Sequence, residues 1–177
     1  MLPILLALGI TAIVFFVLLI GRPDDFKVAR SATIAASPAT VFEQVNDFHK
    51  WEAWSPWAKL DPACKNSFSG AVAGKDAGFA WDGNKKVGAG RMTITDSQAA
   101  ELIRINLEFL RPFEATSTTE FTFKQQGSRT EVTWTMFVKN NLMSKVFGLF
   151  ADCDTMVGKD FEKGLASMKA VVEGAKG

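Results

Sequence analysis

The spacing of hydrophobic residues changes twice along the chain and divides it into three parts. The first part, from Leu2 to Ile20, contains no charged residue. Between about residues 26 and 139, apolar and polar residues mostly alternate in short runs, which is the period of a β-strand. From Met143 onward, apolar residues recur every three or four positions, as in an amphipathic helix. The pattern predicts an apolar segment, a largely β domain and a long terminal helix.

The uncharged first part is long enough to cross a membrane as a helix. At about 1.5 Å per residue, it matches a hydrocarbon layer of about 30 Å. No Lys or Arg precedes it, and the following "GRPDDFKVAR" has no clean cleavage pattern, so a cleaved signal peptide is not favoured. We expect an uncleaved single-pass anchor over residues 1–21, a junction over 22–25 and one folded domain over 26–177. Arg22, Lys27 and Arg30 follow the span, and the positive-inside rule therefore weakly favours a cytoplasmic domain. Because only the amino group lies on the other side of the span, the topology stays open.

The β domain is expected to open with a strand and two short helices. In "SPATVFEQVNDF", Ser37 is a typical helix N-cap and Pro38 suits the first helical position. We expect this helix to end near Phe48, and a second helical piece to carry the tryptophans up to Pro56. The preceding "FKVARSATIAA" alternates as a strand, with one face formed by Val28, Arg30, Ala32 and Ile34.

A series of strands is expected from about Ser67 to Lys139. "GFAWDGNKKVGAGRMTITD" predicts two strands joined by a turn at residues 82–85, and "RPF" and "QGSR" predict further turns. Connections this short make successive strands antiparallel neighbours. In two of the later strands, alternation places on one face Ile103, Ile105, Leu107 and Phe109, and then Val132, Trp134, Met136 and Val138.

The terminal segment predicts a short helical piece and then a long helix from about Asp152 to Glu173. Gly148, Gly158 and Gly164 fall in this helical segment, where each costs roughly 1 kcal/mol relative to Ala, so they suggest either a close approach to the sheet or a break near Gly148. The predicted fold class is α+β: a curved antiparallel sheet of six to seven strands wrapped on a long C-terminal helix. A straight helix across a bent sheet leaves space between them, which we expect to form a cavity.

The element order, together with "NDFHKWEAWSPW" and "DTMVGKDFEKGLASMKAVVE", resembles the START-like or SRPBCC superfamily. Within it, the sequence looks like bacterial polyketide cyclase/dehydrase-type proteins, over about Phe26 to Gly174. The resemblance implies a helix-grip fold with an internal pocket for hydrophobic or amphipathic small molecules. Members of the superfamily include lipid carriers, hormone sensors, ring-closing cyclases and oxygenase subunits, so the resemblance does not select a chemistry.

Composition and charge exclude several classes of function. The chain has 177 residues, 47% of them hydrophobic, with a net charge of +1 and no Lys/Arg run, so no nucleic-acid partner is expected. His49 is the only histidine, which excludes histidine-based metal clusters, and we interpret it as a surface residue at a helix junction. Cys64 and Cys153 match no metal spacing and are interpreted as separate thiols, although a fold that brings them together would allow a disulfide. No glycine motif fits a nucleotide, and we expect no metal and no cofactor.

Two groups of residues are candidates for chemistry or binding. Asp152 and Asp154 lie at the start of the long helix, where acids favour the helix dipole, so a capping role is preferred over general acid/base catalysis. Trp51, Trp54 and Trp57 lie three residues apart and share one side of a helix. They either lock the short helices onto the sheet edge or form a lip at the mouth of the cavity.

The leading hypothesis is a non-enzymatic, membrane-anchored domain that binds a hydrophobic or amphipathic small molecule or lipid in the cavity. One alternative is a cyclase- or hydrolase-like enzyme that uses a pocket carboxylate such as Asp152 or Asp154. Another is a module that docks a protein or membrane and holds no ligand. Position and strand parity select the candidate lining residues Trp54, Trp57, Phe79, Trp81, Ile105, Leu107, Phe121, Trp134, Met136, Met156 and Phe161.

Overall fold

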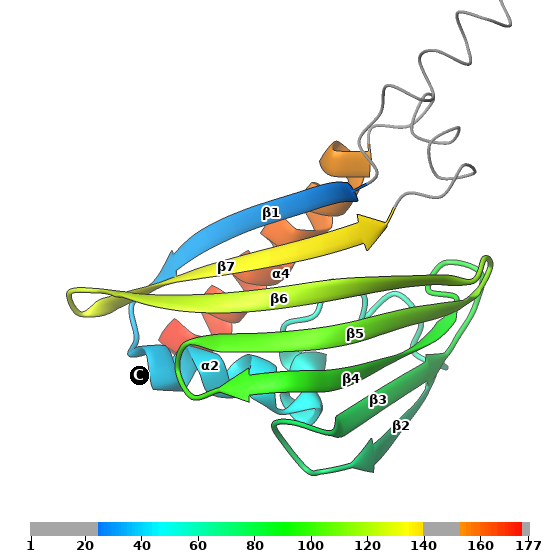
Figure 1. Cartoon of the computed structure of the whole chain (residues 1–177), viewed down its shortest axis with the longest axis horizontal. Helices are drawn as coiled ribbons and strands as arrows, with labels where there is room; N and C mark the ends of the chain where they lie inside the picture. Colours follow the sequence, from blue (N-terminus) through cyan, green and yellow to red (C-terminus); the bar gives the residue numbers. More distant parts are fainter. Residues whose placement is uncertain (1–24, 140–152, 175–177) are drawn as a thin grey trace, which may run out of the picture.

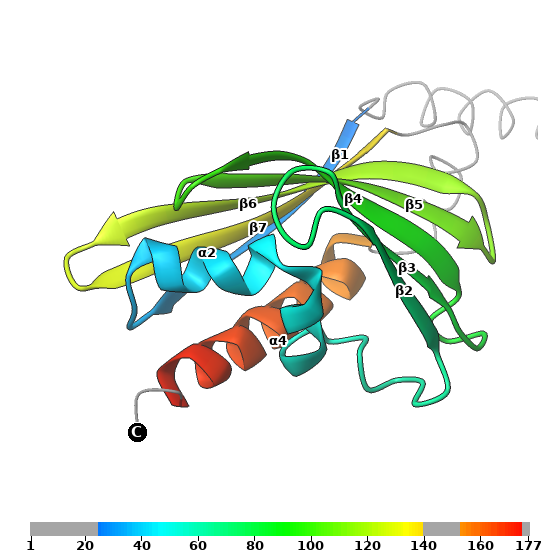
Figure 2. The same ribbon diagram turned by 90° about the horizontal axis from the view of Figure 1, so that it is seen from below.

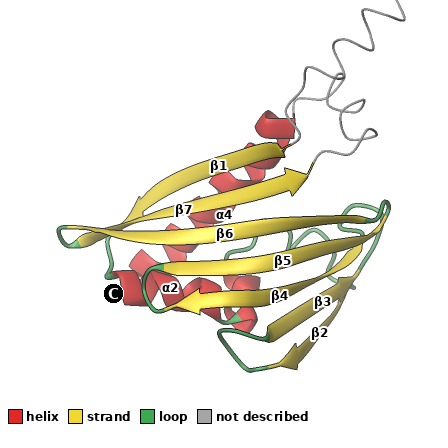
Figure 3. Cartoon of the chain, viewed as in Figure 1, coloured by secondary structure: helices red, strands yellow, loops and turns green. Residues whose placement is uncertain are grey.

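The computed structural model describes residues 25–139 and 153–174, which form one antiparallel sheet with helices on one face (Figures 1 and 3). The sheet has seven strands in the order β1-β7-β6-β5-β4-β3-β2, and every neighbouring pair is antiparallel. The predicted α+β helix-grip fold is confirmed for this part of the chain. The elements are β1 (Asp25–Ile34), α2 (Pro38–Asn46), the 3₁₀ helix η1 (Phe48–Ala53), β2 (Lys65–Gly70), β3 (Ala77–Asp82), β4 (Ala89–Gln98), β5 (Leu102–Arg111), β6 (Ala115–Gln126), β7 (Arg129–Lys139) and α4 (Cys153–Gly174).

The two short helices form where the sequence predicts them. The Ser37 hydroxyl caps α2 by accepting a hydrogen bond from the Thr40 N–H, and Pro38 occupies the first turn. The helix ends at Asn46, two residues before the predicted end. The side chain of Asp47 then caps η1 by accepting from the His49 N–H at 2.9 Å.

One face of the sheet is covered by α2 and α4, and we call it the inner face (Figure 2). Alternation assigned the inner positions correctly: Ile103 and Ile105 on β5, and Val132 and Trp134 on β7, are at most 2% exposed. The sheet curls with the help of register shifts in β4, one of them between Ala89 and Gly90.

The two ends of the sheet differ, and the difference positions the site. At one end, Asp25 of β1 pairs with Lys139 of β7, and the β3–β4 and β5–β6 connections lie alongside. We call this the rim end; it is the right-hand end in Figure 1. The β2–β3, β4–β5 and β6–β7 connections lie at the opposite end, called the far end.

Helix α4 lies along β1 and is fixed to it at both ends. Near the start of the helix, Arg30 bonds to the carboxylates of Asp154 and Glu162. Near its end, Glu173 Oε1 accepts from the Ala35 N–H at 2.8 Å. The described part of α4, Cys153–Gly174, agrees with the helix predicted from about Asp152 to Glu173.

Two predicted segments lie outside the described residues: the N-terminal anchor and the short helical piece before α4. Among the residues that are described, no helix is both long enough and apolar enough to cross a membrane.

Candidate functional site

The middle of the interior is filled by aromatic rings. Trp134 of β7 stacks on Phe161 of α4, with ring centroids 4.0 Å apart and an angle of 7° between the planes. Phe121 also stacks on Trp134, with ring centroids 4.8 Å apart, and Trp54 meets Trp134 edge-on at 5.7 Å. These four side chains are at most 2% exposed. They form a packed core, which we call the ring cluster, where the helix crosses the sheet.

Close approach of α4 makes this packing possible. A Cβ at Gly164 would lie 2.9 Å from Trp134 Cζ3 and 3.1 Å from Pro56 Cδ. A Cβ at Gly158 would overlap the guanidinium group of Arg30. Both glycines predicted to lie against the sheet therefore do so.

The three successive tryptophans have two different environments. Trp51 Nε1 donates to the Val45 carbonyl, and Trp54 Nε1 donates to the Gln44 carbonyl, both at 3.0 Å. These bonds fasten η1 to the last turn of α2, which is the structural role weighed for the tryptophans. Trp57 is 36% exposed and meets Trp134 edge-on at 5.8 Å, so it lies at the margin of the ring cluster.

On three strands the inner residues become less covered towards the rim end, whereas Val28 of β1, Met92 of β4 and Ser117 of β6 stay buried there. Along β5, buried Ile105 is followed by half-buried Leu107; along β7, buried Trp134 is followed by half-buried Met136. On β3, the buried Ala77 is followed by half-buried Phe79 and Trp81. On β3, β5 and β7 four apolar inner side chains are therefore only partly covered by the rest of the described chain. We call Phe79, Trp81, Leu107 and Met136 the open inner surface.

A buried hydroxyl without a partner lies beside this surface. Ser117 of β6 is 6% exposed and pairs in register with Leu107 on one side and Val138 on the other. Its Oγ makes no hydrogen bond with any residue that the structure describes. The next inner residue of β6, Thr119, has a satisfied hydroxyl that donates to the Thr135 carbonyl and accepts from Trp134 Nε1, both at 2.9 Å.

An orphaned hydroxyl is uncommon because burying it without a partner costs about 1–3 kcal/mol. The Ser117 hydroxyl gives this apolar part of the inner face a polar group to which a ligand could hydrogen-bond. Ser117 was not among the residues predicted from the sequence. The alternation of β6 places it on the inner face, but whether its hydroxyl finds a partner depends on which residues of β5 and β7 lie beside it.

Two shallow depressions lie on the outside of the described chain. One, of about 440 Å³, lies over η1 and is lined by Gln44, His49, Lys50, Glu52, Ala53 and Lys59. The other, of about 480 Å³, lies on the β2–β5 side near the rim end, among Lys65, Asn66, Ser67, Ala80, Trp81, Asp82, Ala89, Gly90, Arg91, Leu110 and Arg111. Both are open and partly lined by charged side chains, and neither lies between the ring cluster and α4.

The acidic candidate that the structure describes belongs to an ion-pair network. Asp154 Oδ2 lies 2.9 Å from Arg30 Nη2, and Glu162 Oε1 lies 2.8 Å from Arg30 Nε. The hydrogen bonds to these two carboxylates raise the pKa of Arg30 further above its usual value. Asp154 is therefore held at the start of α4 by a guanidinium group, with 48% of its side chain exposed, outside any apolar pocket. Asp152 lies outside the described residues.

The remaining titratable candidates have structural surroundings. His49 Nδ1 lies 2.8 Å from Asp47 Oδ1, and its ring stacks on Phe68 at 4.0 Å, so this half-exposed histidine joins η1 to β2. Cys64 is a half-buried free thiol whose pKa is raised, mainly by burial. Within the described residues, no group of three His, Cys, Asp or Glu side chains could hold a metal ion.

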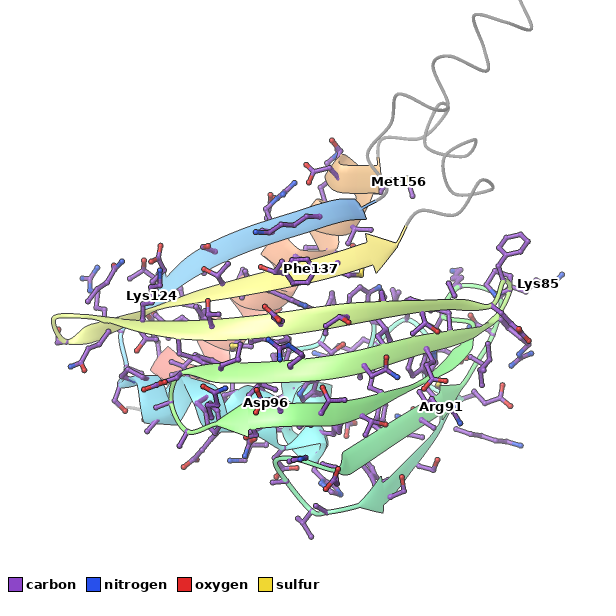
Figure 4. All side chains as sticks on the ribbon, in the orientation of Figure 1. Lys85, Arg91, Asp96, Lys124, Phe137 and Met156 are labelled. Carbon is purple, nitrogen blue, oxygen red and sulfur yellow. The ribbon has the colours of Figure 1, made fainter. Side chains whose placement is uncertain are left out.

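The predicted lining residues thus fall into several groups. Trp54, Phe121, Trp134 and Phe161 form the ring cluster, and Ile105 is buried beside it. Four others form the open inner surface, and Trp57 lies at the margin. Met156, in the first turns of α4, is 62% exposed and lies near the start of β1 (Figure 4). Their role in binding stays a prediction.

Comparisons with known proteins place the fold. The chain is similar to the crystal structure of Mll3558 protein from Rhizobium loti, with 18% identity and a TM-score of 0.61 over 82% of this chain and 96% of that chain. It is also similar to protein CV1439 from Chromobacterium violaceum, with 13% identity and a TM-score of 0.59 over 86% and 99% of the two chains. The Aha1 dimer from Colwellia psychrerythraea matches with 15% identity and a TM-score of 0.58 over 86% and 99%.

These identities are low and show the fold alone, and no curated protein matches the sequence. The family model described as "Polyketide cyclase / dehydrase and lipid transport" matches residues 25–173, which include all seven strands and nearly all of α4. The chain belongs to the polyketide cyclase / dehydrase and lipid transport family.

Proposed function

We propose that this protein is a membrane-anchored domain that binds one amphipathic small molecule or lipid on the inner face of its sheet, towards the rim end. The observation that carries the proposal is the buried, unpartnered hydroxyl of Ser117 beside the open inner surface. The family's description, which names lipid transport beside polyketide cyclisation and dehydration, agrees with a ligand of this kind.

The surface suits a ligand with a long apolar part and a small polar group. The apolar part would cover Phe79, Trp81, Leu107 and Met136, and each Å² of apolar area removed from water contributes about 25 cal/mol. The polar group would exchange a hydrogen bond with Ser117 Oγ, which has no partner among the described residues; because this atom is itself buried, the side chains that cover it would have to move aside for the ligand. Apolar area would then supply most of the affinity, and the hydroxyl would fix the ligand's orientation.

Anchoring is supported by the uncharged run from Leu2 to Ile20, which is long enough to span the hydrocarbon layer. A ligand of this chemistry partitions into membranes. A binding domain held beside the bilayer exchanges such a ligand without moving it far through water.

The test is native mass spectrometry of the full-length chain, released from detergent micelles after incubation with a membrane lipid extract. We expect one retained adduct per chain. In Ser117→Ala, retention should fall about tenfold, because the loss of a buried hydrogen bond worth about 1.4 kcal/mol changes an equilibrium constant by that factor. Ser67→Ala, which removes an exposed hydroxyl on β2, is the matched control. An apo mass for the wild-type chain after this incubation would contradict the proposal.

A second candidate function, a membrane-interaction module without a bound ligand, is favoured by the filled ring cluster. The enzyme alternative finds no such support at Asp154, because that carboxylate is paired with Arg30.

A further inference from the structure

Exposed apolar side chains gather at the rim end of the sheet. Leu60, Leu110, Phe113 and Met156 are 46%, 49%, 73% and 62% exposed. We call these four residues the apolar rim. Of the other large hydrophobic side chains that the described residues leave exposed, Val72 lies in a far-end connection, and the rest are Trp57, Phe68 on β2 and Phe137 on β7.

Independent parts of the chain bring the rim residues to this end. Leu110 and Phe113 flank the tip of the β5–β6 hairpin, where Phe109 pairs with Ala115. Leu60 precedes buried Asp61, whose Oδ2 accepts from the Asn84 N–H at 2.7 Å and so ties this loop to the β3–β4 turn. Met156 lies on the first turns of α4, near the start of β1 (Figure 4).

Lysines lie among these apolar side chains. Lys59 is exposed next to Leu60, and Lys85 and Lys86 are exposed in the β3–β4 turn. Lys85 extends from the rim end in Figure 4. A surface that mixes exposed Leu, Phe and Met with Lys matches the boundary between acyl chains and lipid phosphates.

The sequence places this end of the domain close to the proposed anchor. Only residues 21–24 separate the uncharged run from Asp25, the first residue of β1, and four residues span at most about 14 Å. Because neighbouring strands lie about 4.8 Å apart, the β5–β6 hairpin lies only about 10–15 Å across the sheet from β1. A short tether at one corner therefore keeps Met156 and the β5–β6 hairpin close to the bilayer surface, and the β3–β4 turn lies about 19–24 Å from β1 along the same edge.

We propose that the apolar rim rests in the lipid bilayer interface, so that the open inner surface faces the membrane and the far end points away from it. This orientation rests on the proposed anchor, and it does not depend on whether a ligand is bound. It assigns the rim a partner of defined chemistry: a lipid surface whose acyl boundary takes Phe113 and Leu110 and whose phosphates pair with the lysines.

The test uses the full-length chain in nanodiscs made from an equal mixture of phosphatidylcholine and phosphatidylglycerol. Cys64 and Cys153 are replaced by Ser, and one nitroxide label is placed by Phe113→Cys or Val72→Cys. The two positions are matched, since both are hydrophobic, highly exposed and in a strand connection, but they lie at opposite ends of the sheet. Electron paramagnetic resonance then compares how often the label collides with oxygen, which concentrates in lipid, and with a water-soluble nickel chelate.

We expect the label at position 113 to collide mainly with oxygen and the label at position 72 mainly with the nickel chelate. Lys85→Cys is a second rim position, expected to give an interfacial value, and circular dichroism checks that each labelled chain is folded. Water-like collisions at both 113 and 85, or equal values at 113 and 72, would overturn the orientation. A chain that inserts into nanodiscs and retains its adduct but shows these values would leave the proposed function standing. A chain that does not associate with nanodiscs would overturn the anchor and the orientation together.

Discussion

Ser117 and Thr119 occupy successive inner positions of β6, but only the Thr119 hydroxyl is hydrogen-bonded. In the ligand-free protein, Ser117→Ala removes a polar group that has no partner, so we expect the free energy of unfolding to stay the same or rise by about 1 kcal/mol. Thr119→Val leaves the buried Trp134 Nε1–H unpaired and should lower it by about 1–3 kcal/mol. Urea denaturation of the delipidated full-length chain in detergent, followed by circular dichroism, measures both. A large loss of stability in Ser117→Ala would show that its hydroxyl has a partner after all.

The thiol of Cys64 provides a test of local burial. Burial is the main cause that raises its pKa; a hydrogen bond with the backbone of Asp82 lowers the pKa in part, and the charges of Asp61 and Asp82 raise it further. A raised pKa lowers the thiolate fraction at a given pH, and only the thiolate is alkylated. In a Cys153→Ser chain at pH 8, we expect iodoacetamide to modify Cys64 more slowly in the folded state than in urea.

The rate in the folded state should climb as the pH approaches the raised pKa. Val72→Cys in a chain without the native thiols is the exposed reference and should react at nearly the same rate folded and unfolded. Equal rates for folded and unfolded Cys64 would mean that the loop before β2 does not cover the thiol.

At the residue scale, the sequence was sufficient where a property depends on strand parity. Alternation placed Trp134, Phe121 and Ile105 on the inner face, and the structure confirms those positions. The sequence did not distinguish Trp51 and Trp54 from Trp57, because their exposure depends on which indole reaches a carbonyl of α2. It did not reveal Ser117 either, since a missing partner is a property of three neighbouring strands.

At the element scale, Arg30 fastens the first turns of α4 to β1. Its guanidinium group bonds to Asp154 and Glu162 and lies against Gly158. We expect Arg30→Gln to speed amide hydrogen exchange over residues 154–162, while residues 165–173 change little because Glu173 and Lys169 still bind the end of β1. Hydrogen-exchange mass spectrometry resolves the two halves of the helix.

The control is Arg91→Gln, which breaks an ion pair with Glu108 on the outer face of the sheet and should leave the exchange of α4 unchanged. If Arg30→Gln speeds exchange uniformly along α4, the helix opens as one unit, and Arg30 does not stabilise the first turns separately from the rest.

Gly164 sets the distance between α4 and the sheet. Ala is about 1 kcal/mol more favourable than Gly inside a helix. At position 164, however, its Cβ would press on Trp134 and Pro56, both held in packed surroundings. We therefore expect Gly164→Ala to lower the free energy of unfolding by about 1–3 kcal/mol, the usual cost of overpacking a core. The same denaturation measurement on Gly174→Ala, where a Cβ meets nothing within 4 Å, should show a change within about 0.5 kcal/mol. A neutral Gly164→Ala would contradict a close-packed crossing.

Element boundaries were predictable where local chemistry sets them. Ser37 and Pro38 start α2 as expected, and the apolar repeat predicted the helix that the structure describes over Cys153–Gly174. The end of α2 was predicted two residues late because tertiary bonds fix it. The Asn46 carbonyl accepts from the Gly74 N–H at 2.9 Å, and its side chain accepts from Ser97 Oγ at 2.7 Å. Partners so distant in sequence leave no local signal.

At the scale of the whole molecule, the sheet and α4 enclose two unlike regions. The middle is a closely packed cluster of rings, and the part towards the rim end carries half-covered apolar side chains and one hydroxyl that has no partner among the described residues. The sequence predicted the curved sheet, the covering helix and the apolar inner positions. It did not predict which stretch of the interior is filled, because that depends on register across four strands and on how closely Gly164 lets the helix approach.

If the rim end faces the bilayer, the route of the ligand follows from the orientation of the domain. A molecule dissolved in the membrane would pass the apolar rim to reach the open inner surface, and it would meet Ser117 without crossing bulk water. Replacing Leu110 and Phe113 by Ser should therefore slow loading and leave the bound state intact, because neither residue is part of the open inner surface.

For the full-length chain in nanodiscs, we expect the double variant to load cis-parinaric acid about tenfold more slowly, with the same final occupancy, in a time course of adduct formation by native mass spectrometry. A tenfold change corresponds to about 1.4 kcal/mol in the barrier, which is less than the value of burying two large apolar side chains. Val72→Ser, the matched change at the far end, should load at the wild-type rate. Equal rates for the double variant and the wild type would mean that the ligand enters by another path, whereas a lower final occupancy would place the two residues in the binding site itself.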